Sequence, residues 1–461
     1  MSSGRPIKTL LFALLATAAL FGQDLRAGVG RALITPSTPV WLAGFAARTK
    51  PAESIGLDLY AKALALEDGR GNRVIIVSAD LLGVTREITE EVARRVAQRH
   101  GLRREQILFN ASHTHSGPEV WPRLRVAPVE SAENNARVKE YGRFLMDQFE
   151  AVIGQAIGSL QPASISYSFT EARFATNRRK EQLAELRPGE IFPAPVDPRV
   201  PVVRVSGRDG SVRAVLFGYA CHNTVLTADT NEISGDYAGY AQKALENEFP
   251  GSTAVFLILC GGDQRPAPRG SRELAIKHGE ALAADVAKVV RGEMAASSGE
   301  LKCAIRETQL RFQTHTRESY VAEAQSSDLF AARRGRTMLD AIAGGQPIRS
   351  TQYPAQAMAL GRDLVLLALG GEVVVDYSLR FAREYPDLKL IVAGYSNDVM
   401  GYIPSQRVWM EGGYEAGDAM MYFNQPGWFT PDVEDKVTEA AHGALKDIGF
   451  SCHTCESRKG K

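Results

Sequence analysis

The chain has 461 residues, of which 44% are hydrophobic and 23% are charged. This composition is typical of a globular protein and excludes a disordered, collagen-like or coiled-coil chain. The 54 Lys and Arg residues against 53 Asp and Glu residues give a formal net charge of +1, so no charge surplus indicates a nucleic-acid partner.

The N-terminus has the pattern of an export signal over residues 1–27. Arg5 and Lys8 supply positive charge, residues 10–21 are apolar, and small side chains follow between positions 16 and 22. An uncleaved membrane anchor is the alternative, but the apolar run is shorter than the about 20 residues that cross a bilayer. We therefore expect a secreted or periplasmic protein whose signal peptide is removed.

Downstream of this segment, short apolar runs alternate with amphipathic helical patterns. We expect helices where apolar side chains recur every three or four residues. The expected strands are 74–77, 107–109, 212–219, 254–259, 364–369 and 388–392, and the expected helices are 85–98, 135–157, 237–248 and 273–289. This alternation predicts an α/β fold with a mixed sheet and flanking helices.

Three stretches rich in proline or glycine are expected to be loops: residues 187–201, 266–272 and 343–351. None has the composition of a flexible interdomain linker. We therefore expect a single large domain over residues 28–450, followed by a polar tail over residues 451–461.

Polar or glycine-rich segments directly follow five of the expected strands. These segments are residues 110–117, 220–224, 260–263, 370–372 and 394–398. Because ligands bind at the carboxyl ends of strands in α/β sheets, we expect one convergent site at these strand ends.

The pair His113 and His115 is a candidate metal-binding element, because residues two apart on an extended segment share a face. His222 and Glu372 would complete a hydrolytic zinc site, which usually has three protein ligands and a water molecule. An isolated pair of this spacing is more often a hydrogen-bonded polar pair. Only three of the eight histidines follow buried-looking strands, and we expect the other five at the surface.

Cys452 and Cys455 form a pair near the C-terminus. A structural zinc site would need two further ligands, and a c-type haem would need His where Glu456 stands. In an exported protein we therefore expect a local disulfide. The five cysteines of the chain are too few and too scattered for a disulfide scaffold.

With these motifs assembled, the chain resembles the catalytic domain of the neutral, non-lysosomal ceramidases from about residue 27 to about residue 446. The most specific element is the segment Ser112-His113-Thr114-His115-Ser116-Gly117-Pro118. Weaker elements follow in the family's order at residues 27–30, 34–36, 42–45, 176–178, 220–222, 234–237, 371–372, 401–402 and 413–415.

The resemblance implies a Zn²⁺-dependent amidase, in which the metal acidifies a bound water and polarises the scissile carbonyl. The zinc ligands that it implies are His113, His222, Glu372 and Tyr402.

The resemblance also implies three catalytic groups. His115 falls where the family places a group near the scissile amide, Tyr414 falls on a tyrosine that stabilises the oxyanion, and Arg178 falls on an arginine lining the site. A phenol and an imidazole can both donate hydrogen bonds to a developing oxyanion.

The chain departs from the family's pattern in two ways. Arg265 stands where the family has a catalytic serine, and the chain ends before a C-terminal immunoglobulin-like domain. We expect Arg265 to hold an anionic or strongly polar part of the substrate; the alternative is that it points away and pairs with Asp263. Direct attack by water, without an acyl-enzyme, is then expected. The alternative is that another serine has taken over the lost role, namely Ser112, Ser116 or Ser234.

The leading hypothesis is an exported zinc hydrolase that cleaves an N-acyl, sphingolipid-like amide. One alternative is a zinc amidase or esterase for a smaller or anionic substrate, and another is a non-catalytic binding protein on the same fold. The complete set of implied ligands favours an enzyme. A lipid substrate implies peripheral contact with a membrane, whereas the sequence leaves the substrate and the oligomeric state open.

Overall fold

The computed structural model describes residues 25–37, 40–121, 131–452 and 455. The expected signal peptide therefore lies mostly outside the described residues, as does most of the expected polar tail. The first strand, β1 (Arg26–Leu33), begins two residues before the expected domain start at residue 28. Within the described residues, no helix is both long and apolar enough to cross a membrane.

The larger of two main sheets is mixed. Its strand order is β11 (Thr253–Ile258), β9 (Val212–Tyr219), β8 (Arg199–Gly207), β6 (Gln161–Glu171), β1, β3 (Tyr60–Glu67), β4 (Arg73–Ala79) and β5 (Ile107–Ala111), and β13 (Ala295–Ser297) pairs with β6. The pairs β11–β9 and β4–β5 are parallel, and the other pairs are antiparallel.

A second, four-stranded sheet has the order β14 (Leu301–Arg311), β15 (Ser350–Leu360), β16 (Leu364–Leu369) and β18 (Lys389–Ala393). Here β16 and β18 are parallel. This sheet packs against one face of the larger sheet, because Leu64 and Ile76 of the larger sheet share a core with Leu366 and Ile391 of the smaller one.

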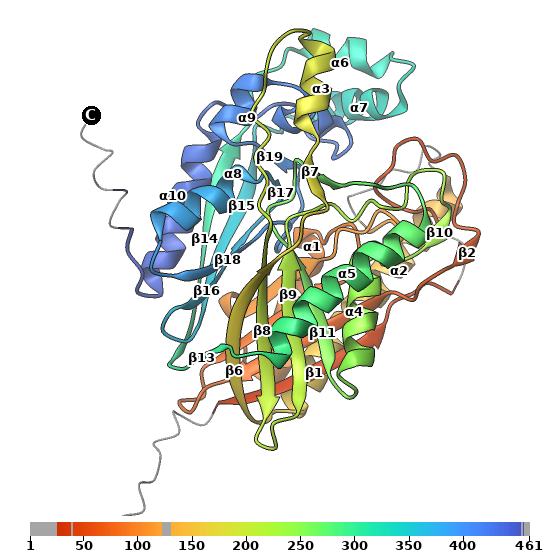
Figure 1. The fold of residues 1–461 in the computed structure, drawn as a ribbon. Coiled ribbons are helices and arrows are strands. Elements are labelled where there is room, and N and C mark those ends of the chain that lie inside the picture. Colours follow the sequence, from red (N-terminus) through yellow and green to blue (C-terminus); the bar gives the residue numbers. More distant parts are fainter. Residues whose placement is uncertain (1–24, 38–39, 122–130, 453–454, 456–461) are drawn as a thin grey trace, which may run out of the picture.

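Helices cover the two outer faces (Figure 1). On the larger sheet these are α1 (Arg86–His100), α2 (Ala132–Gly158), α4 (Asp236–Glu248) and α5 (Arg272–Arg291), and on the smaller sheet they are α8 (Asp376–Glu384) and α10 (Val433–Asp447). The alternation of strand side chains produces these layers: Ile75 faces the α1 and α2 helices, whereas its neighbour Ile76 faces the second sheet. The molecule is thus a helix–sheet–sheet–helix sandwich, and the predicted α/β class with a mixed sheet is confirmed.

All six expected strands and all four expected helices are present, with ends shifted by at most three residues. Serine caps start two of these four helices, since Ser131 accepts a hydrogen bond from Asn134 N and Ser271 accepts one from Leu274 N. The three expected loops are shorter than predicted: β8 begins at Arg199, α5 at Arg272 and β15 at Ser350.

Short elements gather at one end of the two sheets. They include β7 (Ala175–Asn177), α3 (Arg179–Leu186), β10 (Glu232–Ile233), β12 (Gln264–Pro266), β17 (Glu372–Val373), β19 (Tyr402–Ile403) and α9 (Gln406–Glu411). Two-stranded ladders join β12 to β7 and β17 to β19. The register of the second ladder places Glu372 directly beside Tyr402.

Further elements are β2 (Ser54–Ile55), which pairs with β10, and the helices α6 (Arg317–Ala324) and α7 (Leu329–Ala343), which pack against each other. Three short 3₁₀ helices complete the described elements: η1 (Arg104–Gln106), η2 (Tyr414–Ala416) and η3 (Asp418–Met421).

Candidate metal centre and active site

The candidate site lies where the two sheets end, on segments that follow β5, β9 and β16. His113 and His115 follow β5, and His222 follows β9. A parallel bridge between Thr114 and Asn223 holds the two histidine segments side by side. His113 itself has a left-handed backbone with φ of 60°, a strained conformation that is common at functional sites.

The four residues implied as metal ligands lie together and are buried. Glu372 Oε2 is 3.3 Å from His113 Nε2 and 3.2 Å from His222 Nε2. Tyr402 Oη is 3.4 Å from His222 Nε2. The sequence prediction therefore selected side chains that converge in space from three separate strand ends.

Backbone carbonyls orient both imidazoles. His113 Nδ1 is 2.6 Å from Leu82 O, and His222 Nδ1 is 2.8 Å from Gly261 O. Because a carbonyl oxygen only accepts hydrogen bonds, each Nδ1 carries the proton, and each Nε2 presents its lone pair to Glu372. This tautomer is the one required when Nε2 binds a metal.

These donor atoms fit a cation. Burial, reinforced by Arg178, lowers the pKa of His222 to about 4, so this imidazole is neutral at pH 7. Glu372 Oε2 is buried and has no hydrogen-bond partner among the described residues, although two imidazole nitrogens lie close to it. Two nitrogen lone pairs and one carboxylate oxygen that face one another are a donor set of the kind that zinc uses.

His115 is a third imidazole at the same place. Its Nε2 lies 3.2 Å from His113 Nε2, and its ring packs on Phe45 with centroids 4.7 Å apart. Burial, then the neighbouring His113 and His222, hold the pKa of His115 well below its usual value. The ligand atoms of the three histidines all lie within 4.8 Å of one another, so the geometry also makes His115 a candidate ligand.

Arg178 organises the far wall of the site. It donates to Glu415 Oε1 at 2.7 Å, to Gly262 O at 2.8 Å and to Tyr402 Oη at 3.0 Å. Its guanidinium also lies 5.4 Å from the ring centroid of Tyr414. The structure therefore places Arg178 where it positions two tyrosines, and Glu415 is a partner whose role the sequence did not suggest.

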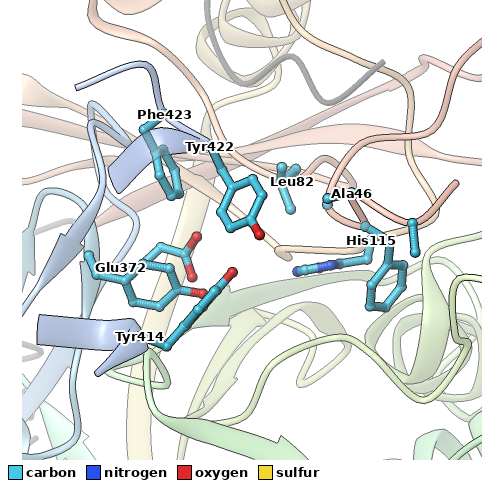
Figure 2. A pocket seen from close by; sticks show the side chains of 11 residues that line it. Ala46, Leu82, His115, Glu372, Tyr414, Tyr422 and Phe423 are labelled. Atoms are coloured by element: carbon cyan, nitrogen blue, oxygen red, sulfur yellow. The ribbon is translucent and has the colours of Figure 1, made fainter. Parts of the chain in front are cut away.

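A cavity of about 200 Å³ opens beside these groups. Its walls are formed by Gly44, Phe45, Ala46, Ala47, Leu82, His115, Glu372, Tyr402, Tyr414, Tyr422 and Phe423. Figure 2 shows the carboxylate of Glu372 and the hydroxyl groups of Tyr414 and Tyr422 turned toward a common space opposite His115. The cavity thus combines apolar walls with polar groups at one end.

Arg265 does not line this cavity. It lies on β12 opposite Thr176, and its guanidinium forms an ion pair with Glu181 of α3. The alternative that Arg265 points away agrees with this placement outside the cavity lining, but the partner that it named is wrong. The guanidinium pairs with Glu181, whereas Asp263 accepts hydrogen bonds from Asn177 Nδ2 and Val375 N. The suggested contact between Arg265 and the substrate stays a prediction.

Tyr395 is a site residue that the sequence reasoning missed. Its ring centroid lies 4.3 Å from that of His113, and the residue is fully buried with φ of 52°. It belongs to the segment 394–398, which was expected at the site because it follows a strand. The position of the segment after a strand thus indicated the site, but nothing in the sequence distinguished Tyr395 from its neighbours.

The comparison with known proteins places the chain in a family. The model of the neutral/alkaline non-lysosomal ceramidases, N-terminal domain, matches residues 25–344, and the chain belongs to this family. Glu372, Tyr402 and Tyr414 lie beyond the matched residues.

Several curated relatives are neutral ceramidases. The neutral ceramidase of Pseudomonas aeruginosa is 26% identical over 274 residues, which are 56% of this chain and 40% of the relative. Neutral ceramidase B of Dictyostelium discoideum is 26% identical over 51% of this chain and 34% of the relative. The neutral ceramidase of Drosophila melanogaster is 25% identical over 58% of this chain and 40% of the relative. The matches thus span less than half the length of these relatives.

The fold has a close counterpart among solved structures. The crystal structure of neutral ceramidase from Pseudomonas aeruginosa matches with a TM-score of 0.70 and 20% identity, covering 93% of this chain and 75% of that chain. A structure described as ceramidase complexed with C2 matches with a TM-score of 0.70 and 18% identity, covering 94% of this chain and 76% of that chain. At this identity the likeness establishes a shared fold.

Proposed function

We propose that the chain is a zinc-dependent hydrolase that cleaves an N-acyl amide. The observation that carries this proposal is the convergence of His113, His222 and Glu372 at the end of a mostly apolar cavity. Membership of the ceramidase family supports the same reaction class. Tyr402, beside Glu372 in the β17–β19 ladder, is the proposed fourth ligand.

The chain's own residues supply the rest of the chemistry. When bound, zinc would supply Lewis acidity toward the amide carbonyl and toward the attacking water. Burial raises the pKa of Tyr414, so its phenol keeps its proton and can donate a hydrogen bond to the oxyanion. His115 is neutral at pH 7 and faces the same cavity, where it can take a proton from the attacking water and pass that proton to the leaving amine.

The proposed nucleophile is water, without an acyl-enzyme. No serine is among the described residues that line the cavity, and Arg265 occupies the position of the family's catalytic serine. Ser112, Ser116 and Ser234 are buried. An acyl group trapped on any serine, detected by mass spectrometry during turnover, would contradict this part of the proposal.

The walls of the cavity suggest an acyl chain as the apolar part of the substrate. Phe45, Ala46, Leu82 and Phe423 surround the space next to the polar groups. Its volume of about 200 Å³ is below the range of about 300–1,000 Å³ that is common for ligand sites. The cavity therefore suits the scissile amide and the first part of the chain, while the remainder of a sphingolipid-like substrate would extend outside, toward a membrane surface.

A smaller or anionic substrate is the second candidate. It rests on the resemblance, which implies that Arg265 stands where the family has a serine; Arg265 lies outside the cavity lining and pairs with Glu181, but its side chain is partly exposed. Hydrolysis of a panel of ceramides, N-acyl amino acids and small amides by the purified chain distinguishes the two candidates.

Metal analysis of purified variants tests the centre itself. His113→Ala and His222→Ala should each lose most of the zinc at this site, and Glu372→Gln should lose a large part of it. His100→Gln, a change of a half-buried histidine at the C-terminal end of α1, is the matched control and should keep both zinc and activity. Full zinc retention in both His113→Ala and His222→Ala would refute the assignment.

We also infer that the chain is exported, which the pattern of residues 1–27 supports. Because β1 begins at Arg26, removal of residues up to about position 24 leaves the strand whole. The intact mass of protein from its native host tests this inference, and a mature chain that starts at Met1 would refute it.

A further inference from the structure

A second group of metal-binding side chains lies outside the candidate active site, beside the helices that cover the smaller sheet. Glu384 ends α8, His442 lies on α10, and Cys452 and Cys455 follow α10. Figure 1 shows these two helices on the opposite outer face from α2, α4 and α5. One ligand atom from each of the four residues lies within 4.8 Å of all the others.

The distances between atoms of these four residues show that they surround a small common space. His442 Nε2 lies 3.2 Å from Glu384 Oε2 and 3.6 Å from Cys455 Sγ. Cys452 Sγ lies 3.8 Å from Glu384 O. All four residues are half-buried, so the position is shielded and yet reachable from solvent.

Neighbouring residues orient two of the four groups. His442 Nδ1 is 2.7 Å from Tyr385 Oη; when Nδ1–H donates to this oxygen, the Nε2 lone pair faces Glu384 and Cys455. Arg380 Nε donates to Glu384 Oε1 at 2.8 Å, so Oε2 is the oxygen turned toward His442. Hydrogen bonds of this kind commonly hold the side chains of metal ligands in the orientation that binding requires.

We propose that Cys452, Cys455, His442 and Glu384 form a structural zinc site when the two cysteines are reduced. The two cysteines are separated by two residues, a spacing that is frequent in zinc sites, and four protein ligands close the coordination shell as structural sites require. This site is distinct from the candidate catalytic centre and does not depend on the proposed function.

In the structure the two cysteines are joined by a disulfide, so the site has two mutually exclusive forms. A phosphine reductant breaks the S–S bond: the two sulfurs take up two electrons and two protons, and the phosphine becomes its oxide with an oxygen from water. Zinc then displaces the two thiol protons and binds both thiolates, the neutral imidazole and the carboxylate.

A bound metal would give His442 and Glu384 a structural role that the disulfide does not give them. The disulfide links residues only three positions apart, so it closes a very short loop and does not tie the tail to the rest of the chain. A metal would instead connect the two cysteines to α10 and to α8, whose residue Glu384 is 68 positions away from Cys452. Such a link fixes the C-terminal segment onto the smaller sheet's helix layer.

Cobalt binding to the reduced full-length chain tests the proposal. Protein is reduced with the phosphine, stripped of metal with a chelator and titrated with Co²⁺, and thiolate-to-cobalt charge-transfer absorption is recorded. We expect one thiolate-bound cobalt per chain, and His113→Ala should keep this band, because the candidate catalytic ligands include no cysteine. The band should vanish in the double variant Cys452→Ser/Cys455→Ser, and Co²⁺ should bind at least tenfold more weakly in His442→Gln and in Glu384→Gln.

Matched controls come from the same chain. Cys303→Ser changes a half-buried cysteine of the second sheet, and His453→Gln changes the histidine between the paired cysteines; both variants should keep the band. In the wild type, zinc should slow alkylation of Cys452 and Cys455 at least tenfold while leaving Cys303 unaffected, a readout that needs no variant. Absence of the band in the reduced wild type, or its full strength in both His442→Gln and Glu384→Gln, would overturn the proposal.

Discussion

Gly44 lies directly against the imidazole of His115. A Cβ atom at position 44 would overlap the Nδ1 and Cγ atoms of that ring, and Gly44 also has a left-handed backbone with φ of +97°. Phe45 packs on the same ring. The loop that carries Gly44 and Phe45 therefore determines where His115 stands in the cavity.

Replacing Gly44 with alanine should displace His115 and lower activity. The backbone conformation alone costs about 1–2 kcal/mol for a residue with a side chain. The displaced imidazole adds a loss of activity of about tenfold to a hundredfold, since a shift of about 1 Å in a catalytic group has effects of this size. Amide hydrolysis and urea unfolding measure the two effects separately.

Gly71→Ala is the matched control for this variant. Gly71 has φ of +81°, and a Cβ atom there would meet nothing within 4 Å. It should therefore show a similar loss of stability with full activity. Equal activity in the two variants would show that Gly44 does not position His115.

Tyr414→Phe should lower kcat by about 10²- to 10³-fold, the usual effect of removing one donor to an oxyanion. Burial raises the pKa of Tyr414, so the wild-type phenol is protonated and able to donate. KM and zinc content should change little, because the hydroxyl acts mainly in the transition state. Steady-state kinetics and metal analysis of the same preparation check this.

Tyr422→Phe serves as the comparison, because Tyr422 lines the same cavity (Figure 2). We expect a loss of less than tenfold in kcat. A larger loss in Tyr422→Phe than in Tyr414→Phe would reassign the oxyanion donor to Tyr422.

The sequence predicted strands best where both faces of the strand are buried. The run that became β16 is continuous and apolar, the run that became β9 is apolar apart from Arg213, and the ends of both coincide with the observed ends. The strands β3 and β15 were missed because alanine-rich segments such as Tyr60–Glu67 have no clear strand preference. The sandwich of two sheets was also unpredicted, because strands buried on both faces show no alternation that would reveal a second layer.

Side chains brought together by distant segments were predicted only where a motif marked them. His113, His222 and Glu372 follow strands and match family motifs, so they were found. Tyr395 and the constraint that Gly44 places on His115 depend on loop conformations with positive φ, which the sequence does not reveal. The pair Cys452 and Cys455 was recognised, but tertiary packing alone brings His442 and Glu384 beside it.

Asp236→Asn should change how stability depends on pH. Burial raises the pKa of Asp236 to about 7, although N–H groups of Leu226 and Tyr237 donate to its carboxylate. An aspartate in the unfolded chain ionises near about 3.9. Between these values the folded protein binds more protons, so its free energy of unfolding falls as pH rises from about 4 to about 7.

The asparagine variant lacks this titration and should lose less stability than the wild type between pH 5 and pH 8, by about 2 kcal/mol. Asparagine also tolerates the left-handed backbone of this position, where φ is 51°. Urea unfolding at both pH values measures the difference. Asp229→Asn, at an exposed position nearby, is the control and should show the pH dependence of the wild type. If Asp236→Asn also showed the pH dependence of the wild type, the raised pKa of Asp236 would be refuted.

Arg265→Ser should lower kcat/KM for N-acyl amino acids about tenfold and leave neutral amides unaffected. The ion pair of Arg265 with Glu181 is largely exposed, with side-chain exposures of 30% and 65%, and such pairs contribute only about 0–1 kcal/mol. A substrate carboxylate can therefore replace Glu181, and a guanidinium suits it because it can bind both oxygens. Glu181→Gln is the matched control: it removes the competing carboxylate and should raise kcat/KM for the anionic substrates, or at least preserve it. If the wild type cleaves ceramide efficiently and Arg265→Ser alters no substrate in the panel, Arg265 has no part in substrate binding.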